Sequence, residues 1–216
     1  MELSQFTPSS ALITILVVAL APFVGVMVTS FTKIIVVLSL LRNSLGLQQV
    51  PPNVVLNGMA LILTIYVMFP VGLEMSARVK TVQSSMSSTQ GIMDMADAAK
   101  EPLRDFLVKH TNPAQRAFFL KTAQKNLPPD RAAQLAENDF VVVVPAFTVS
   151  ELSSAFQIGF LIFLPFLVID LVIANILTAM GMMMLSPTTI SLPFKLLLFV
   201  LVDGWTKIAH GLVLSY

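Results

Sequence analysis

The charged side chains divide the chain of 216 residues into three blocks. Residues 1–73 carry three charges and residues 140–216 carry five. The other 17, nine positive and eight negative, lie in residues 74–139. Two long apolar blocks around a polar one predict an all-α protein, with two kinked apolar helical hairpins joined by a small polar helical segment.

The first apolar block is free of charge from Leu3 to Thr32. This is longer than one span of about 20 residues requires, and the polar run from Thr29 to Lys33 offers a place to break. The sequence "RNSLGLQQVPPN" follows and is typical of a turn, because it holds a glycine and two prolines. A second apolar stretch, Val54 to Leu73, closes near Pro70. The block therefore predicts a helical hairpin.

The polar middle block predicts short amphipathic helices after a low-complexity loop at Gln83 to Gly91. Asn112 and Pro113 are typical of an N-cap and a first helical position, which opens a helix through Lys125. We expect this block to form a small aqueous segment, on the periplasmic side of the membrane. Another helix is indicated by four residues that fall on one face at i, i+3, i+4 and i+7: Leu103, Phe106, Leu107 and His110.

The third block predicts a second hairpin. Thr148 and Glu151 form a capping-box pattern, so we expect a helix to begin there and to run through a kink at Pro165 to Met180. Ser186-Pro187 marks a turn, after which Ile190 to Val202 returns. Prolines in or beside the apolar stretches favour irregular helices packed against neighbours in a complex: Pro22, Pro70, Pro145, Pro165, Pro187 and Pro193.

Composition places the chain among membrane proteins. Hydrophobic residues make up 56% and charged residues 12%, and the mean hydropathy is +0.83, whereas soluble domains have roughly 25% charged residues. A net charge of +1 gives no basic surface for nucleic acid. The sequence has no cysteine, no phosphate-binding glycine motif and no His-Glu-x-x-His zinc motif. We therefore expect no enzyme activity, no cofactor and no metal site.

Ionisable residues inside apolar sequence are costly and usually face protein or water. The ionisable residues in the apolar blocks of this chain have three possible roles. They are catalytic carboxylates of an intramembrane protease, an ion or proton relay of a small transporter or channel, or pairing within or between subunits. The Gly-x-Gly-Asp pattern of intramembrane proteases is absent. Lys195 and Asp203 are eight positions apart, about 12 Å along a helix, so each is expected to pair with another element. We favour pairing and assembly for the set Lys33, Glu151, Asp170, Lys195 and Asp203.

Two further features bear on orientation. Arg42 and Asn43 lie at the loop of the first hairpin, and the positive-inside rule favours the cytoplasmic side for Arg42. The first ten residues carry Glu2 and no basic residue, so the positive start of a secretory signal is missing.

Two long stretches resemble the FliP/SctR family of type III secretion export-apparatus proteins. They are "SFTKIIVVLSLLRNSLGLQQVPPNVVLNGMALILT" and "PAFTVSELSSAFQIGFLIFLPFLVIDLVIANILTAMGMMMLSPTTISLPFKLLLFVLVDGW". The resemblance implies a core subunit of the export gate, through which unfolded secreted polypeptides cross the bacterial inner membrane. Part of the assembly is then expected to project to the periplasmic side. Flagellar members typically carry a signal peptide, so the injectisome branch is favoured.

The resemblance also implies partners and a site. Partners are further copies of the chain, expected as a pentamer, with FliQ/SctS-type and FliR/SctT-type subunits, and the FlhB/SctU-type and FlhA/SctV-type proteins. The site is a pore gasket, for which the long, flexible and polarizable methionine side chain is suited. It falls on three consecutive residues: Met182, Met183 and Met184.

Overall fold

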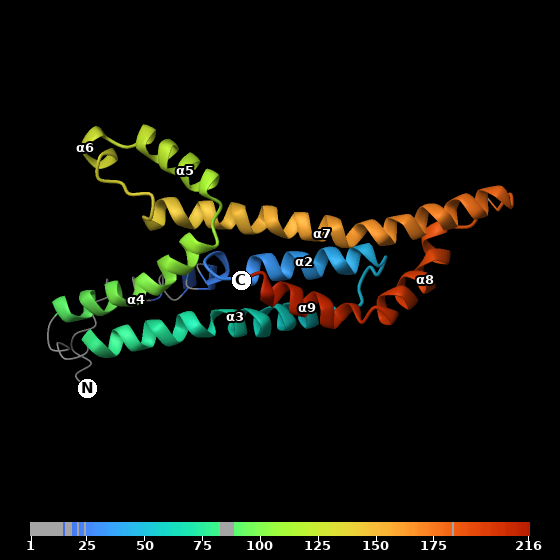
Figure 1. The fold of residues 1–216 in the computed structure, drawn as a ribbon, viewed down its shortest axis with the longest axis horizontal. Helices are drawn as coiled ribbons and strands as arrows, with labels where there is room; N and C mark the ends of the chain where they lie inside the picture. The colour runs from blue at the N-terminus through green and yellow to red at the C-terminus, as the bar shows by residue number, and fades with distance from the viewer. Residues whose placement is uncertain (1–14, 16–18, 21, 24, 83–88, 183) are drawn as a thin grey trace.

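Helices are the only regular elements in the described part of the chain, which confirms the all-α prediction. Figure 1 shows them laid along one long axis, with the polar segment at one end and the turn between α7 and α8 at the other. The computed structural model describes residues 15, 19–20, 22–23, 25–82, 89–182 and 184–216. The helices are α2 (Phe31–Ser44), α3 (Asn53–Val82), α4 (Thr89–Lys109), α5 (Pro113–Asn126), α6 (Pro129–Ala132), α7 (Phe140–Ala179), α8 (Pro187–Leu201) and α9 (Gly204–Leu214).

The first hairpin begins at the predicted break. The Thr29 hydroxyl donates to the carbonyl of Gly25 at 2.7 Å and accepts from the backbone N–H of Phe31 at 3.4 Å, which ends one helical segment and starts α2. Helix α3 holds the whole apolar stretch Val54 to Leu73 and continues through Pro70 to Val82. A proline removes one backbone bond, whereas a break in apolar surroundings would leave several groups unsatisfied.

The main core lies where four helices meet. Gly159 of α7 faces Leu40 of α2, and a Cβ atom there would lie 2.3 Å from Leu40 Cδ1. The missing side chain thus lets the two helices approach closely. The core joins α2, α3, α7 and α9 through Ile34, Val37, Leu38, Leu56, Ala60, Ala155 and Leu212.

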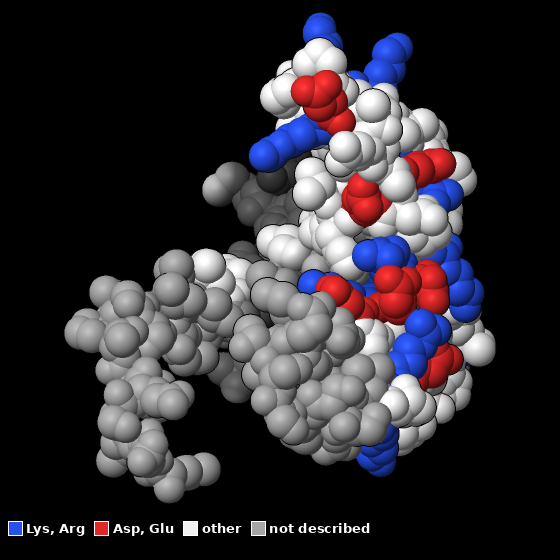
Figure 2. Space-filling model, turned by 90° about the vertical axis from the view of Figure 1, so that its left-hand side faces the viewer, with Lys and Arg blue, Asp and Glu red and all other residues white. Residues whose placement is uncertain are grey.

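The polar segment packs on the beginning of α7. Phe106 and Leu107 of α4 contact Val143 and Phe147 of α7, which confirms the predicted apolar face of α4. The predicted loop at residues 83–91 extends too far, because α4 already begins at Thr89. Residues 83–88 of that loop lie outside the described part of the chain. Figure 2 shows positive and negative side chains interspersed at this end of the molecule.

The helix predicted from Asn112 and Pro113 is confirmed. The Asn112 side chain accepts a hydrogen bond from the backbone N–H of Ala114 at 2.9 Å, and Pro113 is the first residue of α5. Asparagine at this position satisfies a backbone donor that has no partner within the helix.

Among the described residues, α3 and α7 are each long and apolar enough to cross a membrane. Helices α8 and α9 form a third candidate span, bent by 61° at the break between them. The chain is therefore a membrane protein, as the composition predicts.

Candidate functional site

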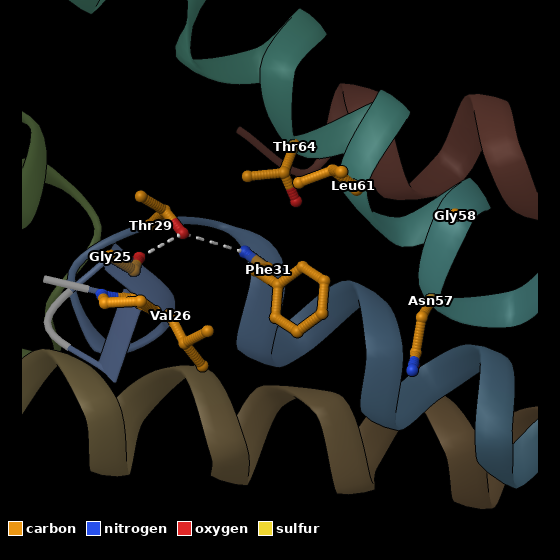
Figure 3. Close-up of a pocket in the computed structure, with 9 residues that line it drawn as sticks. Gly25, Val26, Thr29, Phe31, Asn57, Gly58, Leu61 and Thr64 are labelled. Atoms are coloured by element: carbon orange, nitrogen blue, oxygen red, sulfur yellow. Dashed lines mark hydrogen bonds between the residues drawn. The ribbon is translucent and has the colours of Figure 1, made fainter. Parts of the chain in front are cut away.

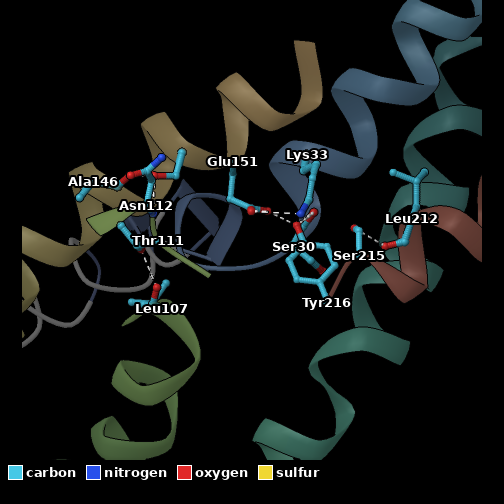
Figure 4. A network of polar contacts seen from close by, with 11 residues as sticks. Ser30, Lys33, Leu107, Thr111, Asn112, Ala146, Glu151, Leu212, Ser215 and Tyr216 are labelled. Atoms are coloured by element: carbon cyan, nitrogen blue, oxygen red, sulfur yellow. Dashed lines mark hydrogen bonds and ion pairs between the residues drawn. The ribbon is translucent and has the colours of Figure 1, made fainter. Parts of the chain in front are cut away.

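A buried ion pair links α2 to α7 next to the main core (Figure 4). Lys33 Nζ lies 3.2 Å from Glu151 Oε1, and the two side chains are 5% and 3% exposed. The Tyr216 hydroxyl donates to the other carboxylate oxygen of Glu151, and the Lys33 ammonium lies 3.8 Å from the centre of the Tyr216 ring. Both charges are thus paired within the chain, as desolvated charges must be.

The capping-box role predicted for Glu151 is wrong. Helix α7 begins at Phe140, and at Thr148 it is already continuous: the Thr148 hydroxyl donates back to the Val144 carbonyl at 2.9 Å. The run of valines before Pro145 packs against α4, and this burial extends the helix upstream of the capping sequence.

His110 adjoins this ion pair. Its ring packs on Phe106 at 4.7 Å and on Tyr216 at 5.2 Å between centroids. It also lines a polar cleft of about 310 Å³ that reaches Lys33 and Glu151. Burial, followed by the charges of Lys109 and Lys33, lowers the pKa of His110 to about 4. The imidazole is therefore neutral at pH 7.

Tyr216 completes the network, and its place could not be predicted from local sequence. Burial, and then the negative charge of Glu151, raise the pKa of its phenol above the usual value. It therefore stays protonated and remains a hydrogen-bond donor to Glu151.

A second ion pair, with a buried lysine and a partly buried aspartate, joins α7 to α8. Lys195 Nζ lies 2.6 Å from Asp170 Oδ2, with side-chain exposures of 4% and 23%. The same ammonium donates to the backbone carbonyl of Ser44, at the end of α2, at 3.2 Å. The Ser191 hydroxyl donates to Asp170 Oδ1. Lys195 therefore pairs with another helix, as predicted. Ser191, four residues before Lys195, is a further partner of Asp170 that was not identified from the sequence.

Asp203 differs from the other four candidate charges. It is exposed in the single chain, at the break between α8 and α9. Its backbone has φ 53°, a left-handed conformation that aspartate tolerates better than most residues. Its carboxylate accepts from the Thr206 hydroxyl at 3.0 Å. Asp203 therefore pairs with no other helix within the described chain, and its predicted pairing between subunits stays a prediction.

Arg42 and Asn43 hold the loop between α2 and α3. The Arg42 guanidinium donates to the Pro51 carbonyl at 3.3 Å and to Asn53 Oδ1 at 2.6 Å. The Asn43 carbonyl accepts from the N–H of Gly46 at 3.0 Å. Arg42 therefore closes the loop onto the first residue of α3.

The methionine stretch forms the turn between α7 and α8, as predicted. Met182 is 42% exposed and Met184 is fully exposed; Met183 lies outside the described residues. Ser186 and Pro187 begin α8, which confirms the predicted end of the turn. Two long thioether side chains thus project from the end of the molecule.

A groove of about 550 Å³ lies between the residues before α2 and one face of α3 (Figure 3). Among the described residues its lining is mainly apolar, with Thr29, Asn57 and Thr64 as polar members and no ionisable side chain. Thr64 donates its hydroxyl to the Ala60 carbonyl at 2.6 Å. The described lining therefore supplies no acid, base or charged ligand for chemistry.

Comparison with known proteins decides the family. The family model described as "FliP family" matches residues 12–212. The chain belongs to the FliP family. It is 52% identical to the hypersensitivity response secretion protein HrcR of Ralstonia nicotianae, over 96% of this chain and 97% of the relative. It is 50% identical to the Yop proteins translocation protein R of Yersinia pestis, over 95% and 94%. The flagellar biosynthetic protein FliP of Bacillus subtilis is 44% identical, over 95% and 90%.

Membership of the FliP family makes this chain a component of a type III secretion export apparatus. The family is a structural part of that apparatus and not an enzyme family. The buried ion pairs and the exposed methionine turn therefore have to be understood as parts of a machine that moves proteins.

Proposed function

We propose that this FliP-family chain is a core subunit of the export gate, and that its methionine turn seals the channel through which unfolded polypeptides pass. The observation that carries the proposal is the position of the turn. Met182 and Met184 project at the far end of a long hairpin, away from the charged end of the molecule. Methionine is flexible and polarizable, so several such side chains close a gap yet yield to a passing chain.

The proposed gate is a complex of several subunits in the bacterial inner membrane. We expect further copies of this chain, as a pentamer, together with FliQ/SctS-type and FliR/SctT-type subunits. FlhB/SctU-type and FlhA/SctV-type proteins would join them. The large exposed apolar surface of α3 and α7 supports burial against other subunits or lipid, with Ile62, Tyr66, Phe69, Phe160 and Leu161 each more than half exposed.

A small transporter or ion channel remains the competing function for buried charges in apolar helices. Such a site needs an ionisable group that exchanges its partner for the transported ion. In the described chain Lys33 is paired with Glu151, and Lys195 with Asp170. These pairs favour a structural role. Asp203, exposed at the α8–α9 break, is the candidate charge placed to contact a neighbouring subunit.

The test replaces Met182, Met183 and Met184 together by alanine in the assembled apparatus. We expect the resting membrane to leak small solutes, measured as uptake of a membrane-impermeant dye, while the complex still assembles. The matched control is Leu214→Ala, which shortens an apolar side chain that is 84% exposed at the end of α9. An unchanged barrier in the triple variant contradicts the proposed seal.

A further inference from the structure

The turn with the methionines lies at the tip of a projecting arm, which we define as the end of α7 after Asp170, the turn, and the beginning of α8 before Ser191. Figure 1 shows α7 continuing past the end of α2, and α8 returning from the turn at its tip. Nine residues of α7 follow Asp170, a length of about 13 Å at the rise of an α-helix. In the arm Leu177 is 8% exposed, whereas Leu171, Val172 and Ile176 are about half exposed. The arm therefore has little packing beyond the contact of α7 with α8.

The second ion pair sits at the base of this arm. Asp170 comes from α7, and Ser191 and Lys195 come from α8. The Lys195 ammonium also donates a hydrogen bond to the backbone carbonyl of Ser44, one of the last carbonyls of α2. Such terminal carbonyls lack donors within their own helix and carry the negative end of its dipole. One cation thus ties three helices together at one point.

Apolar packing secures the body side of this point but not the arm side. The rings of Phe166 and Phe199 pack with a distance of 6.5 Å between their centroids. Leu41 of α2 and Leu45, the residue after α2, belong to the same apolar cluster. These residues lie on the body side of the ion pair along both helices. At the base of the arm the ion pair therefore adds polar contacts that join α7, α8 and the end of α2.

We propose that the cluster of Asp170, Ser191 and Lys195 is a clamp that fixes the direction of the methionine arm. This inference rests on the proposed function for its purpose, since the clamp would hold the turn on the channel axis. Its geometry stands independently of that function. Because Lys195 is shielded from water, Asp170 is only 23% exposed and each has a second partner, the pair is held in one arrangement.

The absence of cysteine from the sequence makes a direct test possible. Cysteines introduced as Gln48→Cys in the α2–α3 loop and Leu185→Cys in the turn are both at exposed positions. Nitroxide labels on them report the direction of the arm relative to the body by pulsed electron paramagnetic resonance. The complex is purified from membranes with unlabelled copies in excess, so that each particle holds one labelled chain.

We expect a narrow distribution of the distance between the two labels in the parental protein. In Asp170→Asn and in Lys195→Met the distribution should be about twofold broader or more. Asp170→Glu keeps the charge and should restore the narrow distribution. The double variant D170N/K195M leaves no unpaired charge, so it folds even if the single variants do not, and it should also be broad. The matched controls Asp203→Asn and Lys207→Met remove the same charges at the α8–α9 corner and should stay narrow.

A distribution that stays narrow in D170N/K195M overturns the clamp. So does equal broadening in the two control variants, because it would show a general effect of lost charge. The distance is measured without secretion, so the clamp and the proposed seal can fail separately. A tight membrane in the methionine-to-alanine variant would overturn the seal and leave the distance result unaffected.

Discussion

Lys33 and Glu151 form an ion pair of 3.2 Å that connects α2 to α7, with both side chains almost fully shielded from water. The Tyr216 hydroxyl binds the same carboxylate, and the Tyr216 ring lies against the Lys33 ammonium. The pair therefore belongs to a closed set of contacts, in which each group depends on the others for compensation of its charge.

Removing one member should be more damaging than removing both. Lys33→Met leaves the Glu151 carboxylate buried without its cation, and we expect a loss of about 3–5 kcal/mol in the free energy of unfolding. The double variant K33M/E151Q leaves no buried charge and should recover much of this loss. Denaturant unfolding of the purified protein in detergent measures both. Equal stability of the single variant and the parental protein would contradict the pairing.

Gly159 tests the close approach of α2 and α7. A Cβ atom would lie 2.3 Å from Leu40 Cδ1 and 3.0 Å from Leu40 Cβ, so Gly159→Ala should cost about 1–3 kcal/mol by forcing the helices apart. Gly72→Ala in α3 is the matched control, because nothing lies within 4 Å of that position. It should gain about 0.5–1 kcal/mol through helix propensity. Thermal unfolding of both variants checks the sign, and a stabilised Gly159→Ala would rule out the tight contact.

His110 should make stability depend on pH. Its pKa is lowered from 6.5 to about 4 in the folded chain, so between these values the unfolded chain binds more protons than the folded one. Stability is therefore fully present above pH 6.5 and falls as the pH drops from 6.5 towards 4. His110→Gln should flatten this part of the profile, measured by denaturant unfolding at a series of pH values.

The exposed His210 provides the control for that experiment. His210→Gln keeps the Phe106–His110–Tyr216 packing and should retain the pH dependence of the parental protein. If His110→Gln and the parental protein lose stability in parallel between pH 6.5 and 4, another group causes the dependence.

The helices and the turn were largely predictable because local signals specify them. Asn112-Pro113 and Ser186-Pro187 place helix starts through the chemistry of the first turn, and tertiary packing agrees with both. At Thr148 the local signal gave the wrong boundary, and at Pro70 the helix proved longer than the apolar stretch. Burial against α4 starts α7 earlier, and apolar surroundings carry α3 through its proline.

The partners of the charged residues could not be predicted from spacing. Lys33, Glu151 and Tyr216 are brought together by the packing of α2, α7 and α9, which no periodicity encodes. The cost of a buried charge correctly indicated that partners exist. It could not show that Asp170 pairs with Lys195, nor that Asp203 is exposed at the break between α8 and α9.

The most direct test of the account places a photo-crosslinking amino acid at position 182 or 184 of the assembled apparatus. A secreted reporter fused to a tightly folded domain is then stalled in transit. We predict crosslinks between the reporter and both positions, and none from position 214 at the end of α9. Crosslinks at position 214 with none at the turn, in an apparatus that still secretes the unfused reporter, would contradict the claim that this chain lines the polypeptide channel with its methionine turn.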